Sequence, residues 1–120
     1  MGDKSYWPTR ERILRPAENN PVRILKAQAK IGNKQFPGLN AVLEKEGHSN
    51  YVFYIGKIIP ILALETSKTK SWYPVTVTAQ SGTRYKVPSV DEFKECIRMI
   101  LHSPETVRYI AQTINPDYKR

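Results

Sequence analysis

The sequence predicts an α+β domain in which an antiparallel sheet of about four to five strands packs against a C-terminal pair of helices. Residues 51–87 are rich in aromatic and β-branched residues interrupted by turn signals, whereas residues 89–115 carry apolar residues at helical spacing. Residues 1–21 are basic and rich in proline, which predicts a flexible N-terminal arm. A single domain would then span 22–120, with its strands within 22–87 and its helices within 89–115.

The first two elements of the domain are predicted from short patterns. Apolar and polar residues alternate at the start of Val22–Ile31, which favours a strand. A helix is the rival for this segment, because its Ala, Lys, Leu and Gln residues are good helix formers. Leu39–Glu46 predicts a short helix that Asn40 would cap and Gly47 would end.

The centre of the chain predicts two apolar strands, Tyr51–Ile55 and Ile58–Glu65, joined by a tight turn at Gly56-Lys57. Both sides of these strands are apolar, so we expect them in the middle of the sheet or covered on both faces. Pro60 indicates that its strand begins late or lies at an edge, because proline has no backbone N–H to pair.

The clearest hairpin signal lies in the next segment. Apolar and polar residues alternate over Tyr73–Ala79, Ser81-Gly82 turns the chain, and Arg84–Val87 returns it. Alternate side chains of a strand lie on the same face. One face of this hairpin should therefore carry Thr76, Thr78, Arg84 and Lys86.

The two C-terminal helices are predicted from their first residues. Ser89 begins a capping-box pattern, and Ser103-Pro104 combines a serine cap with proline at the first helical position. Apolar residues recur every three or four positions after each cap, so both helices should bury one stripe. The predicted core comprises Val22, Ile24, Val52, Ile55, Ile59, Ile61, Leu64, Val75, Val77, Phe93, Ile97, Ile100, Val107 and Ile110.

Charge is the feature that bears most directly on function. The 120 residues carry a formal net charge of +8, and residues 4–34 hold eight Lys/Arg against two Asp/Glu. A basic segment of this kind indicates a surface that meets an acidic partner, and nucleic acid is a common partner of small basic proteins. The competing interpretation is that the charge only keeps the surface solvated.

Catalytic and metal chemistry have little support in the sequence. Cys96 is the only cysteine and lies on the apolar stripe of a predicted helix, which excludes an intrachain disulfide and a cysteine-based zinc site. His48 and His102 have no partner at a useful spacing, and no glycine-rich phosphate loop or nucleophile elbow is present. We therefore expect no enzyme activity, no metal and no cofactor.

The leading functional prediction is a small, basic, nucleic-acid-binding or regulatory module. Its Lys and Arg side chains would contact phosphates, and its aromatic rings would stack on bases. The densest interleaving of aromatic and basic residues is Lys68–Tyr73. The predicted nucleic-acid-binding residues are Arg10, Arg12, Arg15, Lys68, Lys70, Trp72, Tyr73, Arg84 and Lys86.

The alternative prediction is an adaptor or inhibitor that uses the same basic arm against an acidic protein surface. Tyr6 and Trp7 would then anchor the protein partner, because aromatic residues dominate many interfaces. The N-terminus has no apolar signal region, and the apolar stretch Tyr51–Leu64 is too short and interrupted to span a membrane. A cytoplasmic protein with no membrane partner is the resulting expectation.

Overall fold

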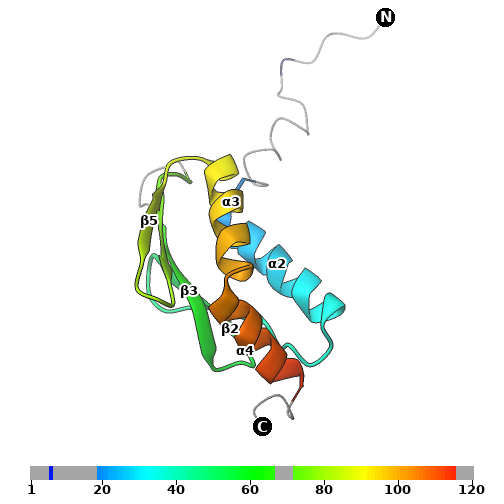
Figure 1. Cartoon of the computed structure of the whole chain (residues 1–120). Helices are drawn as coiled ribbons and strands as arrows, with labels where there is room; N and C mark the ends of the chain where they lie inside the picture. The colour runs from blue at the N-terminus through cyan, green and yellow to red at the C-terminus, as the bar shows by residue number, and fades with distance from the viewer. Residues whose placement is uncertain (1–5, 7–18, 67–71, 116–120) are drawn as a thin grey trace, which may run out of the picture.

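The computed structural model describes Tyr6, residues 19–66 and residues 72–115. Five antiparallel strands form one sheet in the order β1-β2-β3-β4-β5, and the described helices lie together on one side of it (Figure 1). This architecture confirms the predicted α+β class with its C-terminal helical pair. The elements are α2 (Pro21–Gln35), β1 (Val42–Lys45), β2 (Asn50–Ile55), β3 (Ile59–Glu65), β4 (Val75–Ala79), β5 (Arg84–Val87), α3 (Val90–Leu101) and α4 (Pro104–Ile114).

Alternation along the strands gives the sheet a covered face and an open face. Phe53 pairs with Leu62, and Leu64 pairs with Val77; all four side chains are buried in the core together with side chains of the helices. The intervening positions point away from this core. One such row crosses all five strands in register and consists of Glu44, Val52, Ala63, Thr78 and Arg84.

The predicted core is confirmed at most of its positions. Eight of the predicted residues are buried: Ile55, Ile61, Leu64, Val75, Val77, Phe93, Ile97 and Ile100. Four more are partly buried against that core: Val22, Ile24, Ile59 and Ile110. Two predictions are wrong. Val52 lies on the open face, because its neighbour Phe53 takes the covered position, and Val107 exposes 52 % of its surface on α4.

The strand predicted for Val22–Ile31 is wrong, because this segment lies within the helix α2. The Asn20 side chain accepts a hydrogen bond from the backbone N–H of Val22 at 3.0 Å, and Pro21 occupies the first helical position. Leu25 and Ala29, four residues apart, bury the same face of the helix. The chain then leaves the helix through Pro37-Gly38, where Gly38 adopts a φ of 95° that favours glycine.

The short helix predicted for Leu39–Glu46 is also wrong, because Val42–Lys45 forms the edge strand β1. The Asn33 side chain holds both backbone groups of Ala41: its amide nitrogen donates to the carbonyl at 2.9 Å, and its oxygen accepts from the N–H at 2.6 Å. This clamp ties the last turns of α2 to the start of β1. Four residues gain more backbone hydrogen bonds by pairing with β2 than they would in a helix of one turn.

The two central strands lie inside the sheet, as predicted, although helices cover only one of their faces. Gly56 and Lys57 form the turn between them with φ values of 60° and 70°. Pro60 is the second residue of β3, and the register between β2 and β3 shifts beside it, between Phe53 and Tyr54. The shift agrees with the missing N–H of proline.

The second hairpin and both C-terminal helices are confirmed. β4 and β5 pair directly, with Val75 opposite Val87. The Ser89 hydroxyl accepts from the N–H of Glu92 at 3.3 Å and caps α3, and the Ser103 hydroxyl accepts from the N–H of Thr106 at 3.3 Å and caps α4.

Candidate nucleic-acid interface

Helix α2 carries the densest set of described cations. Arg23, Lys26, Lys30 and Lys34 are spaced by three, four and four residues, which places them in one stripe along the helix. At 1.5 Å per residue the stripe is about 16 Å long. All four residues are exposed, and α2 contains no Asp or Glu. We call these four residues the α2 stripe.

The charges of the α2 stripe are uncompensated within the described part of the chain. The ion pairs between described residues are Arg84–Glu65 at 3.6 Å and Arg98–Glu95 at 2.9 Å, and neither includes the stripe. Lys34, in the last turn, favours the helix by meeting its negative end, whereas Arg23 lies near the positive end and gains nothing there. Stabilisation of the helix end therefore accounts for Lys34 and not for Arg23.

The predicted hairpin face forms as expected from the sequence. Thr76 lies opposite Lys86 and Thr78 lies opposite Arg84, so the four side chains share the open face of the sheet. The Arg84 guanidinium is paired with the Glu65 carboxylate on the same face. This hairpin therefore offers one cation without an ion pair to a described residue, Lys86, and one that already has a counter-charge.

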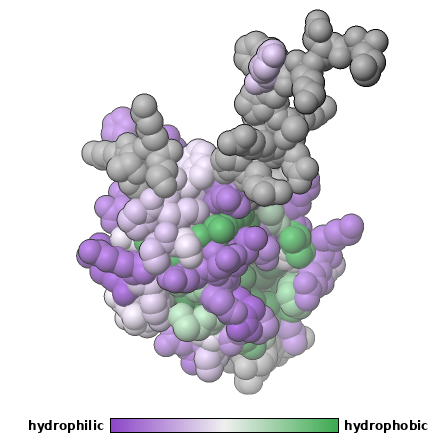
Figure 2. Space-filling model, turned by 90° about the horizontal axis from the view of Figure 1, so that it is seen from above, coloured by the Kyte–Doolittle hydropathy of each residue, from purple (hydrophilic) through white to green (hydrophobic). Residues whose placement is uncertain are grey.

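The two described basic regions do not converge on one surface. Helix α2 lies on the helix-covered side of the sheet (Figure 1), and the α2 stripe lies opposite its buried residues Leu25 and Ala29. Arg84 and Lys86 instead lie on the open face of the sheet. Seen from above, hydrophilic side chains cover most of the visible described surface, and hydrophobic atoms are exposed in small areas between them (Figure 2).

The aromatic residues of the predicted site differ in their placement. Tyr73 is half-buried: its ring packs edge-on against Phe93, with 6.0 Å between the ring centroids, and its hydroxyl donates to the backbone oxygen of Asn19 at 2.8 Å. Burial raises the pKa of Tyr73 to about 12. Its ring therefore has a structural role. Trp72 exposes 42 % of its surface, and Tyr6 is fully exposed.

The remaining predicted site residues lie outside the described residues. These are Trp7, Arg10, Arg12, Arg15, Lys68 and Lys70, and with them most of the predicted N-terminal arm. Their assignment to nucleic-acid or protein binding stays a prediction. The α2 stripe was missed at the sequence level because its segment was interpreted as a strand. Four cations at helical spacing, with no acid among them, were the signal that could have found it.

The described residues offer little for catalysis. Cys96 is buried on the inner face of α3, and this burial raises the pKa of its thiol, as expected for a core residue. His48 and His102 are exposed. No group of three or more His, Cys, Asp or Glu that could hold a metal ion occurs among the described residues.

Comparison with protein-family models, with curated proteins and with solved structures found no match to this chain. None of the helices described here is long and apolar enough to cross a membrane.

Proposed function

We propose that this protein is a small, non-enzymatic module that binds nucleic acid by contacting phosphates. The observation that supports the proposal is the α2 stripe, a row of exposed cations with no counter-charge among the described residues. A row of this kind releases counterions from a nucleic-acid backbone when it binds, which drives association without reading sequence.

The helix suits this role because its two faces have separate tasks. Leu25 and Ala29 anchor α2 in the core, so the opposite face can hold cations without weakening the fold. A rigid helix also keeps successive cations about one turn apart, which lowers the entropic cost of ordering them on a backbone. Among the predicted nucleic-acid-binding residues that the structure describes, exposed Trp72 remains the candidate for stacking on bases.

The proposal is tested by comparing two charge-matched variants of the full chain. Lys26→Gln/Lys30→Gln removes two charges from the α2 stripe, and Arg84→Gln/Lys86→Gln removes two from the hairpin face. Fluorescence anisotropy with a labelled mixed-sequence single strand and a labelled duplex would measure both affinities at low salt. We expect the α2 variant to bind about tenfold more weakly and the hairpin variant to change less than about threefold.

Equal losses from the two variants would contradict the proposal, because net charge rather than the stripe would then set the affinity. Circular dichroism of both variants would establish that the helices are retained.

The alternative partner is an acidic protein surface, with Tyr6 and Trp7 as anchors. Binding of neither nucleic acid at low salt would remove the leading proposal and leave this alternative, which removal of residues 1–20 followed by an affinity pull-down would test. We further propose a cytoplasmic location, with which a single buried cysteine is compatible.

A further inference from the structure

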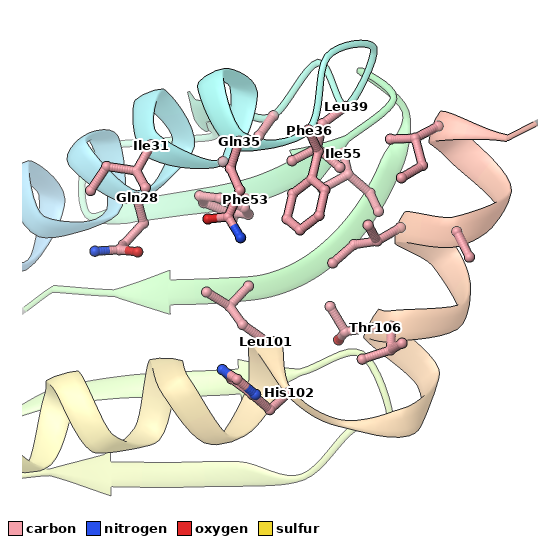
Figure 3. A pocket seen from close by; sticks show the side chains of 16 residues that line it. Gln28, Ile31, Gln35, Phe36, Leu39, Phe53, Ile55, Leu101, His102 and Thr106 are labelled. Carbon is pink, nitrogen blue, oxygen red and sulfur yellow. The ribbon is translucent and has the colours of Figure 1, made fainter.

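An apolar cavity of about 440 Å³ lies between α2 and α4, over β2 and the segment that leads into β1. Figure 3 shows side chains from both helices and from the strand β2 directed into it. The volume falls within the range of about 300–1,000 Å³ that is typical of small-molecule sites. The cavity is therefore large enough for a ligand and too large for a packing defect.

The lining of this cavity contains no charged side chain. Its floor is formed by nearly inaccessible residues, among them Leu39 at 4 % exposure and Ile55 at 2 %. Its rim carries three large apolar residues that remain exposed: Ile31, Val107 and Ile114. A deep apolar floor beneath an exposed apolar rim fits a flexible hydrocarbon chain.

A second, cationic hollow of about 270 Å³ adjoins the apolar cavity at the end of α3. The two share Gln28, Leu101 and His102 in their linings, and the second adds Lys94 and Arg98. Figure 3 places Gln28 and His102 apart from the apolar group of Phe36, Leu39 and Ile55.

The two cations of this hollow differ in their availability. The Arg98 guanidinium is held by the Glu95 carboxylate at 2.9–3.1 Å. Lys94 makes no ion pair with any described residue, and it lies one helical turn before Arg98 on the same side of α3. An anionic group at this position would therefore meet Lys94 first.

We propose that the two adjoining cavities together bind a single-chain amphiphile with an anionic head group, such as a fatty acid. The hydrocarbon chain occupies the apolar cavity, and the head group lies beside Lys94, with Gln28 and His102 as polar neighbours. The uncharged lining of the first hollow and the cationic lining of the adjoining one together favour an amphiphile over a wholly apolar ligand.

The proposal is tested by isothermal titration calorimetry of the full chain with monomeric decanoate, dodecanoate and dodecanol. We expect saturable binding of one dodecanoate. Removing two methylenes should weaken binding by up to about 15-fold, because each buried methylene contributes roughly 0.8 kcal/mol. Dodecanol should bind at least about fivefold more weakly than dodecanoate, because it lacks the charge.

Three variants locate the site, and a fourth serves as the control. Ala111→Phe fills the apolar cavity and should weaken dodecanoate binding more than tenfold; Val107→Trp, at the exposed rim, serves the same purpose if the first variant does not fold. Lys94→Gln should reduce the preference for dodecanoate over dodecanol. Lys26→Gln/Lys30→Gln should leave dodecanoate affinity unchanged.

Absence of saturable binding would overturn the proposal, and so would binding that persists in the cavity-filling variants. A loss of affinity in the Lys26→Gln/Lys30→Gln variant would equally overturn it, because the amphiphile would then occupy the α2 stripe.

Discussion

Helix α2 and the β4–β5 hairpin are both basic, but they present their cations in different ways. The helix places four cations in one row without an acidic neighbour on the same element, whereas the hairpin alternates two cations with threonines and pairs Arg84 with Glu65. The difference shows that the number of basic residues in a segment does not determine how much uncompensated positive charge the segment presents on one surface. Secondary structure decides which charges lie together, and nearby acids decide how many remain uncompensated.

The two regions are also connected through Tyr73. Tyr73 lies just before β4, and its hydroxyl donates a hydrogen bond to the backbone oxygen of Asn19. Asn19 directly precedes Asn20, the cap of α2. The core therefore holds both basic regions in fixed positions, although they point to different sides. We can distinguish the structural role of α2 from its proposed binding role by comparing variants of the residues that anchor it with variants of the α2 stripe.

The largest expected effect follows from Leu25→Ala, which removes the fully buried anchor of α2. We expect a loss of about 2–5 kcal/mol in the free energy of unfolding, measured by urea denaturation. Lys26→Ala, at the next position but exposed, should change that free energy by less than about 0.5 kcal/mol. Similar decreases in the free energy of unfolding of both variants would contradict the division of α2 into an anchoring face and a binding face.

A smaller effect is expected from Asn33→Ala, which removes both hydrogen bonds to Ala41. The free energy of unfolding should fall by about 1–3 kcal/mol, because the backbone groups of Ala41 lose their partners. Hydrogen exchange should show faster opening of the β1 amides in this variant. A stability equal to that of wild type would mean that the clamp does not hold α2 against β1.

Tyr73→Phe should cost about 0.5–1.5 kcal/mol, the contribution of one hydrogen bond. It also gives a pH dependence. The pKa of Tyr73 is raised to about 12 in the folded protein, so the folded state disfavours the charged phenolate. This contribution to stability is fully present below the unfolded pKa of about 10 and is lost as the pH rises through the folded value.

Denaturation curves of wild type and Tyr73→Phe between pH 9 and pH 12 would measure this dependence. Stability of wild type should fall over that interval more steeply than stability of the variant. Parallel curves would show that Tyr73 is accessible to water, contrary to its packing against Phe93.

The smallest expected effect concerns Glu65→Gln, which removes the counter-charge of Arg84. The pair is exposed, so the free energy of unfolding should change by less than about 1 kcal/mol. The affinity for single-stranded nucleic acid should rise by less than about threefold. A larger rise would show that the hairpin is the stronger of the two basic regions.

The elements with two agreeing signals could be predicted from the sequence. The C-terminal helices have a cap followed by apolar residues at helical spacing, and the β4–β5 hairpin has alternation followed by a turn. Asn20-Pro21 is the same kind of signal as Ser103-Pro104, a capping residue with proline at the first helical position. Asn-Pro is also a turn and loop signal, so the sequence instead predicts that Asn20-Pro21 ends the flexible N-terminal arm of residues 1–21.

The edge strand and the cavity could not be predicted from local patterns. Val42–Lys45 becomes a strand because β2 offers a pairing partner and Asn33 holds Ala41, and both are tertiary contacts. The apolar cavity lies between α2 and α4. It therefore depends on α2, whose segment Val22–Ile31 was predicted as a strand because apolar and polar residues alternate at its start.

The most direct test of the account is the salt dependence of nucleic-acid binding by the full chain. The logarithm of the association constant for a single strand, plotted against the logarithm of salt concentration, should fall with a slope of about −3 or steeper, because each phosphate contact contributes roughly −0.7. In Lys26→Gln/Lys30→Gln the slope should become shallower by about 1.4. A wild-type slope near zero, or a slope that this variant leaves unchanged, would contradict phosphate binding by the α2 stripe.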